Sequence, residues 1–393
     1  MKRYGRKNKT ILSQCLLRGL LIASAIPGVL STALLCRQMQ FSPESLKEDT
    51  AVFSALYTVP DRARHQLNSL DQRFSQKVED FPQESTQENF SAENQLPKVD
   101  SDPAPTPKEE FMPLIKSVPK ELPEIPPEYT GKIIEEDFSV SPKNHALTFG
   151  QGVIKNSTSF SDAEAKKYLE AENPVRLDHN GPQVLIMHTH ATESFEPYDT
   201  DTYDTRHTWR STDNQKNIVL AGEVLADQIR SYGIEVLHDD TQHDYPSYNG
   251  SYERSAVTVK NYLKKYPSIK VVLDIHRDAI QRGNTLVKPI ITVNGKKAAQ
   301  LMIIAGCDDG TMGMPNWGKN FRFAAGMQDA IQRGCPGLCR PVFFCHRKYN
   351  QDLTTGSLLI EMGSHGNTLD EVLYTAQLAG NCIGEYLSLL QKN

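Results

Sequence analysis

The chain of 393 residues lacks several patterns that would assign it to a class at once. Its 7 cysteines are odd in number and scattered, so they are not the framework of a small disulfide-stapled domain. The formal net charge of -5 gives no basic excess, which argues against nucleic acid as a partner of the whole chain. Cys335, Cys339, Cys345 and His346 lack the spacing of common zinc fingers. We interpret these cysteines as buried thiols around a loop and assign them no role.

Charge is also missing from a segment near the N-terminus. The first ten residues are rich in Lys and Arg and contain no acid, and a mostly apolar run from Ile11 to Cys36 follows. Its uncharged part, residues 19–35, approaches the roughly 20 residues that a bilayer core requires. The run is longer than a signal-peptide core, about 7–15 residues, and no small residue precedes Cys36 as a lipoprotein site would require.

We therefore predict that residues 1–36 form a cytoplasmic basic tail and an uncleaved transmembrane anchor. Cleavage of a signal peptide after the small residues at 23–25 or 31–33 is the alternative. Residues 37–130 are predicted to be an extracytoplasmic linker, largely disordered, because segments such as Pro97–Pro107 cannot bury enough apolar surface to fold. Such a spacer lets a tethered domain work away from the bilayer.

Residues 131–180 are predicted to be a small N-terminal extension, in which residues 147–154 form a strand pair. From residue 181 onward, strand and helix patterns alternate. The pattern predicts strands at 184–187, 235–238, 270–275 and 357–360, helices at 213–232, 254–266 and 321–333, a last helix starting at 368, and a hairpin of 285–293 with 300–305 turned at 294–295. This alternation predicts an α/β catalytic domain over 181–393, with a mixed, mostly parallel sheet and helices on both faces.

Three of these apolar strands stop where a metal-type ligand or a carboxylate begins. His190 and Glu193 follow the first strand, His276 ends the second, and Glu361 ends the third. Sites in open α/β sheets assemble at the carboxyl ends of the strands, so we expect these side chains to meet. Two imidazoles and one carboxylate hold zinc and leave a position for water. The pattern predicts a zinc hydrolase in which Glu361 transfers protons.

Several nearby residues have two interpretations each. Asp213 is either an alternative metal ligand or the cap of the helix that begins there. Asp274 and Asp278 flank His276 and either orient imidazoles or are solvated loop carboxylates. Arg277 either binds a substrate carboxylate or forms a surface ion pair.

The polar, aromatic loop 245–252 either suits a carbohydrate or peptide groove or is an ordinary turn-rich loop. Tyr248 and Tyr252 of this loop are therefore candidate substrate-binding residues.

In six segments the chain resembles the stage II sporulation protein P family of endospore-forming bacteria. These segments are His188–Ser194, Asp213–Gly222, His238–Tyr252, Asp274–Asp278, Tyr349–Gln351 and Leu358–Gly363. The resemblance covers about 181–393, and the anchor and linker also fit this family. Asn350, in the fifth segment, is added to the candidate substrate-binding residues.

The resemblance implies the phosphorylase/hydrolase-like fold of zinc N-acetylmuramoyl-L-alanine amidases, with peptidoglycan as the substrate. It implies a membrane-anchored cell-wall hydrolase that acts in forespore engulfment, between the two membranes at the sporulation septum. Amidase and cross-link endopeptidase activities are implied, as are two partners, the stage II sporulation proteins D and M. In the related amidases the carboxylate ligand lies further along the chain, near Asp213. The spacing of His190 and Glu193 is more similar to zinc carboxypeptidases, and we favour Glu193 as the ligand.

Two other functions remain open from the sequence. A zinc carboxypeptidase-type peptidase would need an arginine for a terminal carboxylate, such as Arg277 or Arg340. A non-catalytic recruitment anchor would use the long linker as its main device, although the four site residues are all present.

Overall fold

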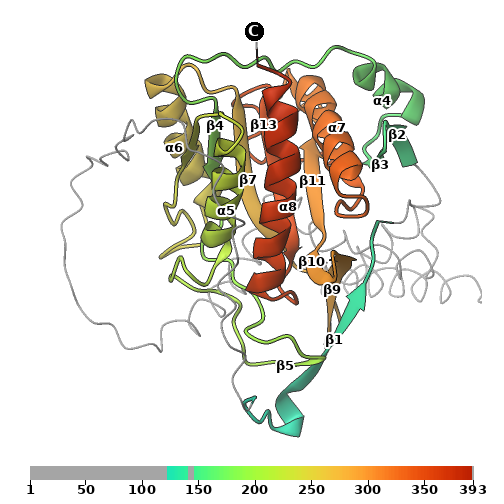
Figure 1. The fold of residues 1–393 in the computed structure, drawn as a ribbon, viewed down its shortest axis with the longest axis vertical. Coiled ribbons are helices and arrows are strands. Elements are labelled where there is room, and N and C mark those ends of the chain that lie inside the picture. The colour runs from blue at the N-terminus through green and yellow to red at the C-terminus, as the bar shows by residue number, and fades with distance from the viewer. Residues whose placement is uncertain (1–121, 140–145, 392–393) are drawn as a thin grey trace, which may run out of the picture. The chain divides into compact units, whose positions relative to one another are not determined.

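A computed structural model of the chain describes residues 122–139 and 146–391 (Figure 1). The predicted anchor at 1–36 and most of the predicted linker lie outside the described residues. In the two described ranges, no helix is both long and apolar enough to cross a bilayer.

An eight-stranded sheet forms the centre of the described residues. Its strand order is β2 (Ala146–Phe149), β3 (Gly152–Ser157), β12 (Val342–Cys345), β11 (Leu301–Gly306), β13 (Gly356–Ser364), β7 (Val271–Asp278), β4 (Val184–Met187) and β6 (Val236–His238). Neighbouring strands are parallel except β2 with β3 and β11 with β13. The predicted mixed, mostly parallel sheet is confirmed.

The helices cover the two faces of this sheet, because successive strand residues point to opposite sides. Helices α5 (Ile218–Arg230), α8 (Leu369–Ser388) and α7 (Trp317–Gly334) lie side by side across one face (Figure 1). They bury residues such as Ile186 and Leu273 in the main apolar core. Helix α6 (Ser251–Lys265) lies on the other face, where Val259 and Tyr262 pack with Leu185, Met187 and Val272.

A smaller sheet has the strand order β10 (Lys296–Ala299), β9 (Thr285–Val293), β1 (Thr130–Glu136) and β5 (Thr202–Asp204), and β8 (Gln281–Arg282) also pairs with β9. Strand β1 runs parallel to β9 and antiparallel to β5. The buried Lys288 of β9 joins this sheet to α8, because its Nζ lies 2.7 Å from the Glu371 carboxylate.

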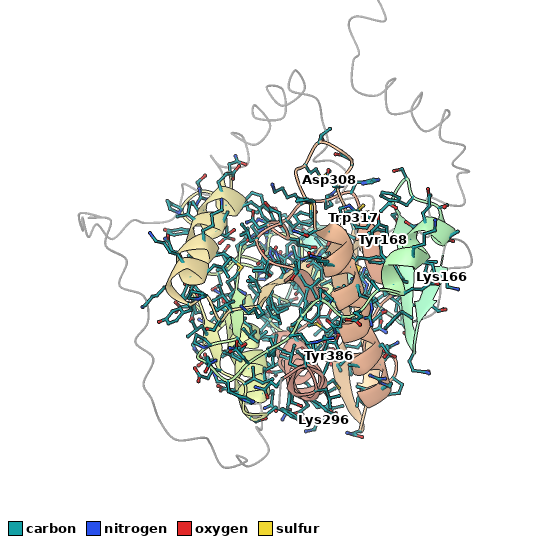
Figure 2. All side chains as sticks on the ribbon, turned by 90° about the horizontal axis from the view of Figure 1, so that it is seen from above. Lys166, Tyr168, Lys296, Asp308, Trp317 and Tyr386 are labelled. Atoms are coloured by element: carbon teal, nitrogen blue, oxygen red, sulfur yellow. The ribbon has the colours of Figure 1, made fainter. Side chains whose placement is uncertain are left out.

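The predicted N-terminal extension contributes to both sheets. Strand β1 belongs to the small sheet, while β2 and β3 form the predicted antiparallel pair at the edge of the large one. A short 3-10 helix, η3 (Pro127–Tyr129), precedes β1, and α4 (Asp162–Leu169) follows β3. Helix α4 packs on the start of α7, where the rings of Tyr168 and Trp317 are 4.4 Å apart (Figure 2). The described parts of residues 131–180 therefore pair with strands of the predicted catalytic domain.

The predicted hairpin and the start of the first predicted helix differ most from the structure. The turn at Asn294 and Gly295 joins β9 to β10, which ends at Ala299, and not to residues 300–305. Residues 301–306 are almost entirely buried and pair in the large sheet as β11 instead. The helix predicted from 213 begins at Ile218, because the Asn217 side chain accepts the hydrogen bond from Val219 N at 3.0 Å and caps it.

Candidate metal centre

Strand register brings two of the predicted site residues, His276 and Glu361, together. In β7, Asp274 and His276 lie on the same face as Val272, the face that α6 covers. In the parallel neighbour β13, Glu361 is the register partner of His276. Directly opposed residues of neighbouring strands project to the same side, so Glu361 and His276 share this face.

The turn after β4 supplies the other two residues. His190 Nδ1 lies 3.7 Å from Glu193 Oε1, and His276 Nδ1 lies 3.6 Å from Glu193 Oε2. One ligand atom from each of the three residues lies within 4.8 Å of the others, and all three residues are buried. The structure thus brings His190, Glu193 and His276 into a cluster that could hold a metal ion.

The outer nitrogen of each imidazole lies within 3.1 Å of a side-chain oxygen. His190 Nε2 lies 3.1 Å from Ser251 Oγ at the start of α6. His276 Nε2 lies 2.8 Å from Asp274 Oδ1, and the Asp274 carboxylate also accepts hydrogen bonds from the amide and hydroxyl of Thr189. Such outer partners orient metal-binding histidines, and here they leave both Nδ1 atoms facing Glu193. The arrangement fits a divalent metal of the zinc type. Asp274 is buried in the structure, so it is not a solvated loop carboxylate.

The charges around the cluster favour an ionised Glu193. Burial acts to raise the pKa of Glu193, but Arg277 and the two histidines outweigh it and hold that pKa well below its usual range. Burial and the neighbouring His276 lower the pKa of His190 to about 3, so this imidazole is neutral. Burial opposes protonation of His276 too, yet Asp274 and Glu193 raise its pKa well above the usual value. A metal ion at this cluster would therefore have to displace the His276 proton.

Glu361 carries an unsatisfied carboxylate oxygen. Its Oε2 is buried and has no hydrogen-bond partner among the described residues. Burial, with repulsion from Asp278, raises the pKa of Glu361 to about 8. Native structures rarely leave a buried polar atom unpaired, and a shifted carboxyl pKa beside a possible metal site is typical of acid–base residues.

Aromatic rings from the predicted substrate-binding loop cover the histidines. The Tyr248 ring stacks on His190 with 4.5 Å between centroids, and the Tyr252 ring lies parallel to His276 at 6.5 Å. Asn350 Nδ2 donates hydrogen bonds to Tyr252 O and Ser255 Oγ, so this residue supports the first turn of α6. The structure thus places both tyrosines against the cluster and Asn350 behind them.

Arg277 and Arg340 are both directed inward. Arg277 is buried and donates hydrogen bonds to the backbone carbonyls of Ser194 and Trp209, at 3.0 and 3.1 Å. Arg340 is buried and pairs with Asp278 at 2.8 Å. Neither interpretation of Arg277 as a substrate-binding or a surface residue matches this position, because its guanidinium is used to hold the turn that carries Glu193.

Asp213 is exposed and lies apart from the cluster. Its carboxylate pairs with Lys216 at 2.8 Å and accepts a hydrogen bond from Gln215 N. It caps no helix, since α5 begins at Ile218 behind Asn217. The structure therefore brings Glu193, and not Asp213, to the histidines.

Sequence reasoning missed Ser251, Thr189 and Asp244, which support the site. Asp244 has a fully buried side chain and accepts the Thr192 hydroxyl hydrogen bond at 2.6 Å, between the two ligands of the turn. No local spacing connects Asp244 or Ser251 with the turn at 188–194, so only the placement of α6 and of the loop before it shows these contacts.

A second group of acids, Glu135, Asp199 and Glu371, also lies within ligand distance of one another. Lysine side chains already fill it. Lys288 Nζ lies 2.6 Å from Asp199, and Lys297 Nζ lies 2.8 Å from Glu135. We interpret this group as an ion-pair network between the small sheet and α8.

Two solved amidases are similar to part of this chain. The N-acetylmuramoyl-L-alanine amidase AmiC2 of Nostoc punctiforme is 12% identical, with a TM-score of 0.32, over 53% of this chain and 96% of that one. The CwlD amidase of Clostridioides difficile, solved in complex with the GerS lipoprotein, is 13% identical, with a TM-score of 0.34, over 53% and 99%.

The family comparisons are more specific. A curated stage II sporulation protein P of Bacillus subtilis (strain 168) is 29% identical over 216 residues, which are 51% of this chain and 50% of that protein. The match thus spans about half the length of this relative. The family model of stage II sporulation protein P matches residues 48–384. The resemblance seen in the sequence is confirmed, and the chain belongs to the stage II sporulation protein P family.

Proposed function

We propose that this protein is a zinc-dependent peptidoglycan hydrolase that cuts the bond between the lactyl group of muramic acid and L-alanine. One observation carries the proposal: His190, Glu193 and His276 form a buried cluster with both Nδ1 atoms facing the carboxylate, and Glu361 stands in register beside it. Family membership supports the substrate class. Cross-link endopeptidase activity at the same site is part of the proposal.

His190, Glu193 and His276 would hold the zinc ion. Zinc bound there would polarise the amide carbonyl and lower the pKa of a bound water to about 7. In its ionised form, which the charge of a bound metal ion would favour, Glu361 would take a proton from the water that adds to the lactyl carbonyl carbon, and would pass it to the L-alanine nitrogen as the C–N bond breaks. Amide hydrolysis needs this second transfer because an amine leaves poorly without a proton. Tyr248, stacked on His190, would form a wall of the substrate groove.

The two alternatives have less support. The two arginines considered for the terminal carboxylate of a carboxypeptidase substrate, Arg277 and Arg340, are both buried and paired, so neither is free for that role. A non-catalytic anchor would have no use for the buried, unpaired Oε2 of Glu361, which costs stability.

We extend the proposal to the setting. The chain would be held in the cell membrane by residues 1–36, with the catalytic domain between the two membranes at the sporulation septum. It would act in forespore engulfment with the stage II sporulation proteins D and M. Affinity capture of the tagged chain from sporulating cells, with the His276→Ala variant beside it, tests these partners independently of catalysis.

The deciding experiment measures metal content and products on the same preparation. The wild-type chain should hold one zinc ion and release muramic acid with a free lactyl carboxyl from purified wall, as detected by mass spectrometry. His276→Ala should lose both the metal and the activity. His207→Ala, a change outside the cluster, is the matched control. Release of free terminal amino acids instead would favour the carboxypeptidase, and zinc binding with normal digestion by His276→Ala would show that the site is misassigned.

A further inference from the structure

Three arginines lie close to carboxylates of the candidate site, and they differ in exposure. The Arg277 amide donates a hydrogen bond to Glu193 and the Arg340 guanidinium pairs with Asp278, and both of these arginines are buried. Arg210 Nη2 lies 4.0 Å from Glu193 Oε1, and the Arg210 side chain is 37% exposed. Of the three, only Arg210 can therefore meet a molecule that arrives from solvent.

Arg210 is nevertheless held in place. Its Nη1 donates hydrogen bonds to Asp244 Oδ2 at 2.9 Å and to Thr192 Oγ1 at 3.3 Å. Asp244 is a rigid anchor, because its side chain is fully buried and also accepts from the Thr192 amide and hydroxyl. An antiparallel backbone bridge places Arg210 opposite Glu193. One side of the guanidinium is thus tied to the turn that carries two of the candidate metal ligands.

The other edge of the guanidinium has open donors. Arg210 Nη2 lies 4.0 Å from Glu193 Oε1, which is too far for a hydrogen bond. Neither Nε nor Nη2 donates a hydrogen bond to any residue in the described ranges. These two nitrogens form a fork that matches the two oxygens of a carboxylate. The guanidinium also lies over Tyr248, 5.2 Å from the ring centroid, so it continues the wall that covers His190.

Balancing the negative charge of Glu193 does not explain the open donors on this edge of the Arg210 guanidinium. Glu193 already accepts the Arg277 amide hydrogen bond at 3.0 Å, and its two carboxylate oxygens lie 3.7 Å from His190 Nδ1 and 3.6 Å from His276 Nδ1. The exposed Arg210 guanidinium, 4.0 Å away, is not required to balance the charge of Glu193. Its two open donors point to a ligand with a negative charge.

We propose that Arg210 binds a substrate carboxylate through Nε and Nη2 and so selects the stem peptide. This inference rests on the proposed function. In peptidoglycan, L-alanine is followed by a D-glutamyl residue linked through its side-chain carboxyl. Its α-carboxylate is the anionic group nearest to the scissile bond on the side of the leaving amine. Walls in which this group is a carboxamide would bind less well.

Peptide binding to the zinc-loaded full chain tests the inference. The background is Glu361→Gln, which keeps the peptides intact, and the probes are two synthetic muramoyl peptides that differ only in this carboxylate or carboxamide. We expect the carboxylate peptide to bind about ten- to a hundredfold more tightly, the range of a charge-assisted hydrogen bond. Arg210→Gln should weaken the carboxylate peptide to the level of the carboxamide peptide, and Arg210→Lys should retain part of the preference.

Arg206→Gln is the matched control, because Arg206 lies on the same segment and pairs with Asp204 instead of the site. It should leave the preference unchanged. Equal weakening of both peptides by Arg210→Gln would overturn the inference, as would a loss of zinc affinity in that variant with the preference intact, or a failure of both peptides to bind. Turnover by the wild-type chain is read separately. If it releases no lactyl group while the binding preference depends on Arg210, the proposed function fails and the carboxylate site stands.

Discussion

At the scale of single residues, the candidate site sets burial against charge. Glu193 and Glu361 are both buried carboxylates of this site, and their pKa values are shifted in opposite directions. Glu193 has Arg277 and two imidazoles beside it, which hold its pKa low, whereas burial and Asp278 raise the pKa of Glu361 to about 8. Pairs of carboxylates whose environments separate their pKa values commonly divide the roles of fixed charge and proton carrier.

Glu361→Gln should keep zinc and lose turnover. The amide is nearly the same size and still accepts hydrogen bonds, so folding should survive, but it cannot carry a proton. We expect a loss of about 10²–10⁴ in rate, the size expected for removing a general acid–base group. Metal analysis and wall digestion on the same sample measure both quantities. Near-wild-type turnover at full zinc occupancy would place the proton carrier elsewhere.

Glu193→Ala and Asp213→Ala should differ in zinc affinity. Glu193 lies between both imidazoles, while Asp213 is exposed and paired with Lys216. We expect Glu193→Ala to weaken zinc binding strongly, because a third protein ligand is lost, and Asp213→Ala to bind zinc like the wild type. Titration against a chelating dye decides between them. The reverse order would make Asp213 the ligand.

Glu196 should make folding stability depend on pH. It is 6% exposed and accepts a hydrogen bond from Trp209 Nε1, and burial raises its pKa to about 7. The unfolded chain, with an ordinary pKa of about 4.3, gives up this proton earlier. The resulting stability is complete below the unfolded-state pKa and is lost as pH rises to the folded-state pKa. The loss is of order 3 kcal/mol.

Glu196→Gln should remove most of that decline. Urea unfolding of both chains at pH 4.5 and pH 8 measures it, and the variant should be the more stable of the two at pH 8. Glu223→Gln, on the exposed face of α5, is the control for a change of net charge alone. A parallel decline in the variant and the wild type would contradict the assignment.

At the scale of elements, the sequence was most informative where a strand ends. The apolar runs of β4, β7 and β13 were predictable because the change to His190, His276 or Glu361 is abrupt. The register that pairs Glu361 with His276 was not, because a sequence does not state which strands are neighbours. The same reason hides Ser251 and Asp244, which reach the site from the region around α6.

Helix ends were harder to predict for a local reason. Asp213 and Asn217 are both residues that favour caps, and they lie four positions apart. The structure selects Asn217, whose buried side chain also donates to Ser211 O at 2.9 Å and so satisfies two groups at once. The Ile218 amide then donates to Glu193 O at 2.8 Å, which links the start of α5 to the site turn.

Asn217→Ala should therefore destabilise the fold, and Asp213→Ala should not. Loss of an N-cap costs about 0.5–2 kcal/mol, and the buried position of Asn217 places it at the upper end. Midpoints of urea unfolding, with unchanged slopes, give the comparison. An equal effect of the two substitutions would show that the cap lies in the turn before Asn217.

At the scale of the whole molecule, the segment before residue 181 supplies strands to both sheets of the described residues. Strand β1 lies between β9 and β5 in the small sheet, and β2 and β3 extend the large one. The predicted boundary at residue 130 lies where η3 meets β1, within folded structure. Thr205 N donates to Tyr129 O at 2.9 Å, and the Arg206 guanidinium lies 4.4 Å from the centroid of the Tyr129 ring.

These contacts determine where the catalytic part can be separated from the predicted anchor. A chain that begins at Leu122 keeps η3 and all of β1, so we expect it to fold, bind zinc and remain in the soluble fraction. A chain that begins at Gly131 loses Tyr129 and the pairing of Thr130 with Asp204, and should unfold at a lower urea concentration.

The full-length chain should sediment with membranes, because residues 19–35 are apolar and uncharged. Fractionation followed by carbonate extraction measures this, and recovery of a shortened chain, without its N-terminal segment, in the soluble fraction would favour cleavage over anchoring.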